Sequence, residues 1–183
     1  MYHKILKCGA CGNLYIPSSK FSTIRKPIKI YTDGSCHSQL LLGAWACLVF
    51  IEDEKVILKG EEEATTHNRM ELQAVIKALL YIDKRGFEQQ ELEIYSDSQY
   101  VVNLLGREEK LKSKNFITAK GTPIQNVDLV QTLLALIKSH HINFFKVKAH
   151  QKDGDVNNRE VDIIVRQLVR KNQSKHDNRT KIE

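Results

Sequence analysis

Apolar and polar residues alternate along residues 28–33 (IKIYTD), as they do in a half-buried strand. Residues 44–51 are strongly apolar and β-prone, which predicts a central strand, and residues 55–60 fit as its hairpin partner. The charged residues 52–54 form the turn between them. Three strands in succession with short links predict an antiparallel meander. Because Asp33 ends the first strand and a glycine follows it, we expect its carboxylate at the rim of the sheet.

The period changes to that of a helix at residue 68. Up to residue 84 the apolar residues fall on one helical face, and Gly86 predicts the end of this helix. Residues 106–125 are charged and are predicted to be irregular. The remaining pattern predicts strands at 92–95 and 142–147 and helices at 98–105, 127–139 and 158–171.

The order of these elements is β-β-β-α-β-α-α-β-α, which predicts an α/β fold. A long crossover that includes a helix joins the first strand to the fourth, so we expect these strands to be parallel neighbours. Their carboxyl ends then share one edge of the sheet, where open α/β sheets bind ligands. Asp33 and Asp97 each follow one of these strands.

The predicted domain covers residues 27–172. Residues 1–26 have no clear period and are predicted to be an extension of uncertain structure, and residues 173–183 a polar tail that frays. The extension carries Cys8 and Cys11, whose spacing is that of half a zinc site. Since no second pair with suitable spacing lies nearby, we favour either no metal or zinc shared between chains.

The net charge of +6 and the pI near 9.1 favour a polyanionic partner such as nucleic acid, although a merely soluble basic protein has the same signature. No apolar run approaches the ~20 residues of a membrane span, and the N-terminus lacks the apolar stretch of a signal peptide. We therefore expect a cytoplasmic protein. Cys36 and Cys47 lie in the core pattern and are interpreted as small buried hydrophobic residues.

Four carboxylates are candidates for a metal site. Asp33 and Asp97 would repel each other at the shared sheet edge unless a cation or a proton lies between them. Taken alone, Asp97 is better explained as the N-cap of the helix at 98–105. Glu71 stands one turn into its helix and has a capping-box alternative, with Asn68 as the N-cap. Asp162 lies on or beside an apolar helix face and needs a partner.

The partner of Asp162 is either a metal ion or a basic residue one turn away, namely Arg159 or Arg166. Four oxygen donors suit Mg²⁺ or Mn²⁺ and not Zn²⁺, and such a cluster can hold two ions about 3.5–4 Å apart across a phosphate. His150 follows the fifth strand in a polar segment. It is either a solvated loop residue or a group that moves protons beside the metal.

Several motifs, in order, resemble those of the type 1 ribonuclease H family, most closely the bacterial ribonuclease HI group. The resemblance covers roughly residues 28–171. The matching segments are YTDGSC (31–36), THNRMEL (66–72), SDSQYV (96–101), NVDL (126–129), VKAH (147–150) and NREVD (158–162).

The resemblance implies a five-stranded mixed sheet, three antiparallel strands plus two parallel, flanked by helices. It also implies endonucleolytic hydrolysis of the RNA strand of RNA–DNA hybrids, which leaves 5′-phosphate and 3′-hydroxyl ends. Asp33, Glu71, Asp97 and Asp162 would hold two Mg²⁺ ions, with Mn²⁺ as a substitute, and His150 would assist proton transfer or product release. We predict no protein partner and expect a monomer.

The resemblance also implies a set of substrate contacts, for which turn and cap chemistry is the alternative. Recognition of RNA would rest on its 2′-hydroxyl groups. Residues 106–116 match the length of the family's basic handle, but its tryptophans are missing and two glutamates dilute its charge. His67 stands where the family commonly has an Asn. The implied contacts with the hybrid are Gly34, Ser35, Cys36, Thr66, Asn68, Gln99, Asn158 and, as an aromatic platform in the handle, Phe116.

Two other functions remain open from the sequence. A nucleic-acid-binding module on the same fold would bind a hybrid without cutting it. Another polynucleotidyl transferase, such as an integrase or a 3′ exonuclease, is the second alternative. The exonucleases of that kind have an Asp-x-Glu pair on the first strand, whereas this chain has Asp33-Gly34-Ser35, which argues against them.

Overall fold

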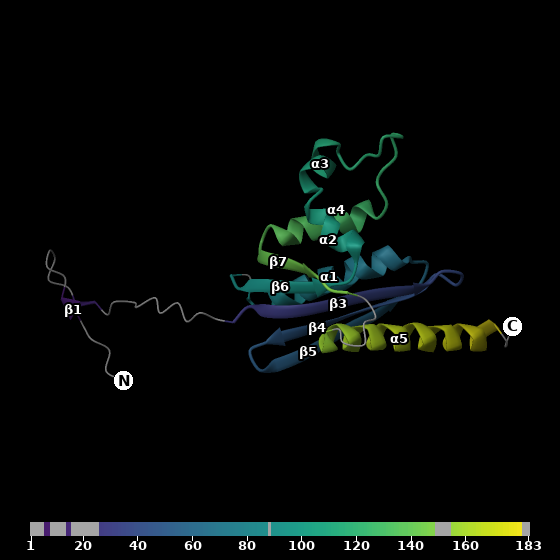
Figure 1. Cartoon of the computed structure of the whole chain (residues 1–183), viewed down its shortest axis with the longest axis horizontal. Coiled ribbons are helices and arrows are strands. Elements are labelled where there is room, and N and C mark those ends of the chain that lie inside the picture. Colours follow the sequence, from purple (N-terminus) through teal and green to yellow (C-terminus); the bar gives the residue numbers. More distant parts are fainter. Residues whose placement is uncertain (1–5, 8–13, 16–25, 88, 149–154, 181–183) are drawn as a thin grey trace.

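A five-stranded mixed sheet forms the centre of the computed structural model, which describes residues 6–7, 14–15, 26–87, 89–148 and 155–180 (Figure 1). The strand order is β5-β4-β3-β6-β7, with three antiparallel and two parallel strands as predicted. The strands are β3 (Ile28–His37), β4 (Leu42–Ile51), β5 (Glu54–Glu62), β6 (Glu91–Ser96) and β7 (His141–Lys146).

Five helices accompany this sheet in the described part of the chain. They are α1 (His67–Lys84), α2 (Gln99–Leu105), α3 (Glu108–Ser113), α4 (Val127–Ile137) and α5 (Val156–Thr180). In the N-terminal extension, β1 (Leu6–Lys7) and β2 (Leu14–Tyr15) pair antiparallel as a separate two-stranded sheet. Cys8 and Cys11 lie outside the described residues, so the zinc alternative for them stays a prediction.

The pairing of β3 with β6 confirms that the first and fourth predicted strands are parallel neighbours, from Ile28 opposite Leu92 to Thr32 opposite Ser96. The prediction that the strand ends at Asp33 was wrong. β3 continues to His37 because its other edge stays paired with β4 over that length. Asp33 reaches the sheet edge because its neighbour β6 ends beside it, and not because its own strand ends.

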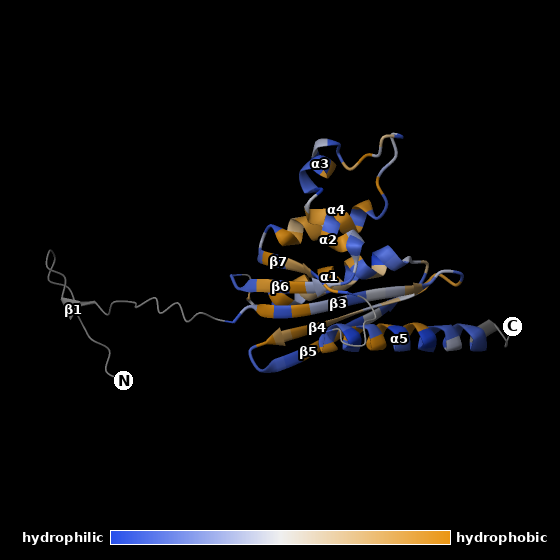
Figure 2. Cartoon of the chain, in the orientation of Figure 1, coloured by the Kyte–Doolittle hydropathy of each residue, from blue (hydrophilic) through white to orange (hydrophobic). Residues whose placement is uncertain are grey.

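The two faces of the sheet are covered differently. On one face α1, α2 and α4 enclose the larger core, which includes Ile30, Leu79 and Leu133. On the other face α5 packs against β3 and β4, and the buried cluster there is small. In Figure 2 the apolar residues of α5 lie toward its N-terminal part, while its C-terminal part is mostly hydrophilic.

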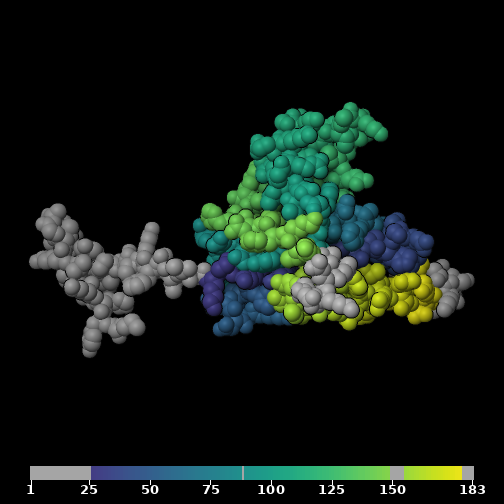
Figure 3. Space-filling view, in the orientation of Figure 1, coloured from purple at the N-terminus to yellow at the C-terminus, as the bar shows by residue number. Residues whose placement is uncertain are grey.

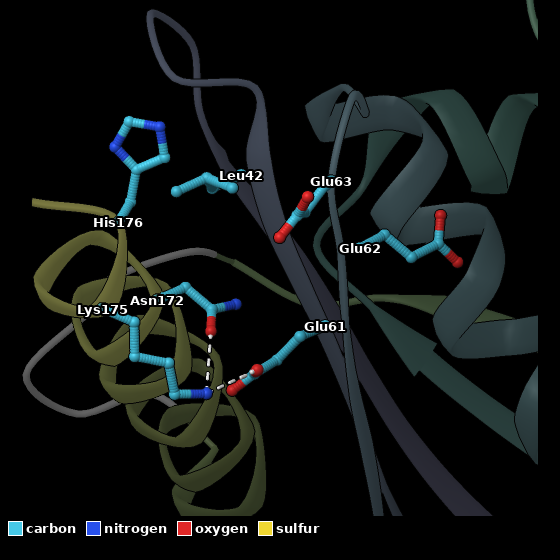
Figure 4. A pocket seen from close by; sticks show the side chains of 7 residues that line it. All are labelled: Leu42, Glu61, Glu62, Glu63, Asn172, Lys175 and His176. Carbon is cyan, nitrogen blue, oxygen red and sulfur yellow. Dashed lines mark hydrogen bonds and ion pairs between the residues drawn. The ribbon is translucent and has the colours of Figure 1, made fainter. Parts of the chain in front are cut away.

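α5 does not end near Lys171, as the apolar pattern predicted, but continues to Thr180. Its last turns lie beside the end of β5, where Lys175 Nζ is 3.2 Å from Glu61 Oε2 and 3.4 Å from Asn172 Oδ1 (Figure 4). These three residues line a cleft together with Glu62, Glu63 and His176. The added turns of α5 therefore contact β5 through polar side chains, whereas the prediction of the helix end was based on its apolar residues.

The charged segment after α2 is not wholly irregular, because it contains α3. Leu111 is buried and anchors this helix to the main core, and Phe116 packs against the same core with a positive φ of 58°. Lys112 forms an ion pair with Glu108 one turn away. This pair neutralises part of the positive charge that is expected of a handle that binds phosphates. Figure 3 shows that this region stands above the rest of the molecule in that view.

Cys47 is buried, as predicted, whereas Cys36 is only partly buried. Both are free thiols. Within the described ranges, no helix is both long enough and apolar enough to span a membrane.

Candidate metal centre

Four carboxylates from four different elements line one open cleft of about 270 Å³ at the sheet edge where β6 ends. Asp33 comes from β3, Glu71 from α1, Asp97 from the residue after β6 and Asp162 from α5. The remaining lining residues are Gly34, Ser35, His67 and Arg166. The structure therefore brings together all four acids that the sequence singled out.

Gly34 allows α1 to approach β3 closely enough for this arrangement. A Cβ atom at position 34 would lie 2.3 Å from the backbone nitrogen of Glu71 and 2.3 Å from the carbonyl carbon of Met70. Both are backbone atoms, so neither can turn aside as a flexible side chain would. The missing side chain at Gly34 thus sets the distance between the strand of Asp33 and the helix of Glu71.

The Glu71 carboxylate is held at both oxygens. Ser98 Oγ donates to its Oε2 at 2.5 Å, and His67 Nε2 lies 3.1 Å from its Oε1. Glu71 is only 8% exposed, so these contacts compensate for the loss of water around it. The hydrogen bond to Glu71 also raises the pKa of His67 above its ordinary value.

Both capping alternatives for the candidate acids were wrong. Thr66, and not Asn68, is the N-cap of α1, since its hydroxyl accepts the Arg69 N–H at 3.4 Å. Ser98, and not Asp97, is the N-cap of α2, since its hydroxyl accepts the Val101 N–H at 3.2 Å. Asp97 lines the cleft and does not cap the helix, and the hydroxyl of Ser98 contacts both the start of α2 and Glu71.

Asp162 has the basic partner that its sequence position suggested. Arg166 Nε lies 2.9 Å from Asp162 Oδ1, one turn along α5. The start of α5 is fixed by Asp155, whose Oδ1 accepts the N–H of Asn157 at 2.8 Å and whose Oδ2 accepts the Tyr31 hydroxyl at 3.1 Å. Since Tyr31 is two residues before Asp33 on β3, this bond ties the helix of Asp162 to the strand of Asp33.

The charges in the cleft are not balanced by its own side chains. Burial, and then the nearby carboxylates of Asp97 and Asp162, raise the pKa of Asp33 to about 7. A divalent cation would relieve this repulsion, and the donors are hard carboxylate oxygens of the kind that Mg²⁺ and Mn²⁺ prefer. In this respect the residues fit the predicted metal.

The side chains do not already stand as a closed coordination shell. Among the described residues, no group of three or more His, Cys, Asp or Glu side chains is arranged to hold an ion as it stands. Two of the four carboxylates have protein partners, since Glu71 contacts Ser98 and His67, and Asp162 contacts Arg166. Mg²⁺ sites typically complete their shell with water and substrate phosphate, so an open arrangement of carboxylates suits this ion.

A second cleft of about 350 Å³ adjoins the first, between the starts of α1 and α4. It is lined by Thr66, His67, Asn68, Gln125 and Asn126, so His67 belongs to both clefts. A fork of two hydrogen bonds from Arg69 to Asp128, at 2.9 and 2.8 Å, joins the two helix starts. This pair lowers the pKa of Asp128 and keeps the walls of the second cleft together.

Four other predicted contact residues do not line either cleft. Cys36 Sγ faces the carbonyl oxygen of Thr65 at 3.4 Å, and Gln99 is exposed and accepts from Lys146. Phe116 is packed against the main core, and Asn158 is buried in the first turn of α5. His150 falls outside the described residues, so its role stays a prediction.

Sequence reasoning missed the roles of two residues that touch Glu71. His67 was noted only as a departure from the family, although its spacing of four from Glu71 on a helix was a usable signal. Ser98 had no such signal, because it contacts Glu71 from the N-cap of a different helix and lies 27 residues away in sequence.

Comparisons with known proteins show which family the chain resembles. The sequence profile of a family described as RNase H matches residues 25–170. A protein named Ribonuclease H from Prosthecochloris aestuarii is 40% identical over 151 residues, which are 81% of this chain and 99% of that protein. A Ribonuclease H from a Thermoanaerobacter species is 41% identical over 133 residues, covering 72% of this chain and 83% of that protein.

Two solved structures share the fold. LC9-RNase H1, described as a type 1 RNase H with the type 2 active-site motif, superposes with a TM-score of 0.68 at 23% identity, covering 78% of this chain and 71% of that chain. A foamy viral protease-reverse transcriptase in complex with dsDNA superposes with a TM-score of 0.63 at 16% identity, covering 78% of this chain and 93% of that chain. At these identities the likeness concerns the fold alone.

Proposed function

The chain belongs to the ribonuclease H family, and on that basis we propose that it is an endonuclease that hydrolyses the RNA strand of RNA–DNA hybrids. The products would carry 5′-phosphate and 3′-hydroxyl ends. The observation that carries the proposal is the convergence of Asp33, Glu71, Asp97 and Asp162, from four elements, on one open cleft.

These four residues would hold the divalent metal, which we take to be two Mg²⁺ ions. When bound, such a pair would supply a more acidic attacking water and stabilisation of negative charge at the departing 3′ oxygen. The protein's part is to hold the carboxylates in place before substrate arrives. Gly34 sets the spacing of α1 and β3, and Ser98 orients Glu71.

The RNA–DNA hybrid would lie across both clefts. The second cleft offers hydroxyl and amide groups of Thr66, Asn68 and Asn126, which suit the phosphates and sugars of a nucleic-acid strand and not a small apolar ligand. The net charge of +6 favours the polyanion as a whole. Discrimination for RNA would rest on its 2′-hydroxyl groups.

We further propose that the enzyme acts as a monomer in the cytoplasm. All four carboxylates come from one chain, so the cleft needs no residue from a second copy. Both described cysteines are free thiols, which is the usual state in a reducing compartment.

An internally labelled RNA–DNA hybrid, tested beside matched double-stranded DNA and double-stranded RNA, examines this proposal. We expect Mg²⁺-dependent internal cuts confined to the RNA of the hybrid. The variant Asp97→Asn should lose at least about a thousandfold in rate, because a missing ligand removes transition-state stabilisation, while it still binds hybrid. Binding without cleavage in both Mg²⁺ and Mn²⁺ would instead identify a nucleic-acid-binding module.

A further inference from the structure

His67 occupies a position that links the two clefts. It is the first residue of α1, one turn before Glu71, and its Nε2 atom lies 3.1 Å from Glu71 Oε1. Its side chain is 57% exposed and lines both the carboxylate cleft and the neighbouring one. Glu71, by contrast, is almost fully buried. The imidazole is thus the exposed half of a contact whose other half is a candidate metal ligand.

The two contacts of Glu71 differ in how firmly they are anchored. Ser98 is buried, and its hydroxyl also caps α2, so its orientation is fixed by the helix start. With the hydrogen bond to Ser98 alone, the Glu71 carboxylate could still turn about its own side-chain bonds. His67 supplies that contact from the same helix as Glu71, at the spacing that brings two side chains together on a helix.

We propose that His67 is a positioning residue for the metal site, which holds the Glu71 carboxylate in the orientation that binds the divalent ion. This inference rests on the proposed function for the identity of the ligand, but not for the contact itself. A carboxylate oxygen has room for both a hydrogen bond and a metal ion. Partners of this kind, which orient a ligand without touching the metal, typically account for 10- to 100-fold in metal affinity or activity.

The exposed side of the imidazole faces the cleft in which the nucleic-acid strand would lie, so a simple role in hybrid binding must be separated from positioning. A positioning role acts on the metal, and its loss should be repaired by more metal. A role in hybrid binding alone acts on the KM for hybrid and should leave the metal dependence unchanged.

Calorimetric titration of the full chain with Mn²⁺, without any nucleic acid, tests the proposal directly. We expect His67→Ala to weaken Mn²⁺ binding by about tenfold. His67→Gln keeps an N–H donor of similar reach and should recover most of this loss, to within about threefold of the wild type. His141→Ala is the matched control, because His141 is an exposed histidine on β7 and should leave the affinity unchanged.

Steady-state hydrolysis of a hybrid completes the test. For His67→Ala, the metal concentration at half-maximal rate should rise by about tenfold, while the KM for hybrid at saturating metal changes by less than about twofold. An unchanged or tighter Mn²⁺ affinity would overturn the proposal, as would a raised KM with unaltered metal dependence. If the wild type binds Mn²⁺ but never cuts hybrid, the proposed function fails while the calorimetric comparison still decides the role of His67.

Discussion

The two faces of the central sheet contribute to the same site but are built differently. On the α1 face, Glu71 is 8% exposed, lies at the edge of the large core and is held by Ser98 and His67. On the α5 face, the buried cluster is small and the Asp162 side chain is 19% exposed. Its contact is with Arg166, whose side chain is itself 48% exposed.

We therefore expect the carboxylates of Glu71 and Asp162 to differ in rigidity. Glu71 owes its position to close packing of a helix on a strand, which changes only when the core changes. Asp162 owes its position to a helix that packs on β3 and β4 through a smaller apolar cluster, which includes the buried Val161 and Val165, and that polar contacts hold at its start. We expect this smaller cluster to open at lower free energy than the main core does. Changes on the α1 face should therefore affect folding and activity together, whereas changes on the α5 face should separate them.

The largest effect is expected at Gly34, where the α1 face is closest. In Gly34→Ala the new methyl group would stand 2.3 Å from backbone atoms of α1, so the helix must move away from β3. We expect the free energy of unfolding to fall by about 3 kcal/mol and hydrolysis to be lost with it. Urea denaturation and the hybrid assay measure the two quantities.

Gly106→Ala is the matched control for this change. Gly106 has an ordinary helical φ of −63°, and the nearest atom to an added Cβ lies 3.9 Å away. The control should leave both stability and rate close to those of the wild type. If Gly34→Ala behaved like Gly106→Ala, the close approach of α1 and β3 would not be what positions Glu71.

A pH-dependent effect of intermediate size is expected from Asp33, which stands between the two faces. Burial and the carboxylates of Asp97 and Asp162 raise its pKa in the folded, metal-free protein to about 7, above its ordinary value of 3.8. The folded state then holds a proton that the unfolded state has released. The favourable contribution is therefore present below about pH 4 and is lost as the pH rises through about 7.

Urea denaturation in EDTA, from about pH 5 to about pH 8, measures this effect against Asp33→Asn, which has no such proton. We expect the wild type to lose on the order of 2 kcal/mol relative to the variant across this range, after allowance for the partial exposure of the site. Equal pH dependence of the two proteins would show that neither burial nor the neighbouring carboxylates raise the pKa of Asp33 in the folded state.

The smallest effect is expected on the α5 face. Tyr31→Phe keeps the ring, which stacks on Tyr95 at 4.6 Å between centroids, but removes the hydrogen bond to Asp155. We expect a loss of about 1 kcal/mol in stability and a fall in kcat of less than about tenfold, since α5 is released from β3 only at its start.

Tyr95→Phe provides the comparison, because the Tyr95 hydroxyl donates to Glu93 on its own strand at 2.8 Å. It should cost little in stability and leave kcat unchanged. If Tyr31→Phe had no more effect on kcat than Tyr95→Phe, the bond to Asp155 would not position Asp162.

Periodicity was sufficient to predict most of the fold. The alternation in residues 28–33 and the helical spacing in residues 68–84 reflect burial against neighbours, and burial is what a pattern of apolar residues records. The crossover rule then placed β3 beside β6, and with them Asp33 beside Asp97. The site was predictable to the extent that it follows from this topology.

The features that were not predicted depend on polar contacts or on neighbouring strands. β3 extends past Asp33 because β4 pairs with it. α5 extends to Thr180, and Lys175 in this added part pairs with Glu61. Asp97 and Ser98 are both good N-cap residues, so their local sequence cannot decide which of them caps α2. In the structure Ser98 takes that place, and its hydroxyl also contacts Glu71.

The central claim is that carboxylates from both faces of the sheet hold one divalent metal centre. Anomalous scattering from crystals of the protein grown with Mn²⁺ locates the ion directly. The account predicts a peak in the cleft within about 2.3 Å of oxygens from Asp33 and at least two of Glu71, Asp97 and Asp162. A well-occupied Mn²⁺ ion elsewhere on the chain, with this cleft empty, would contradict it.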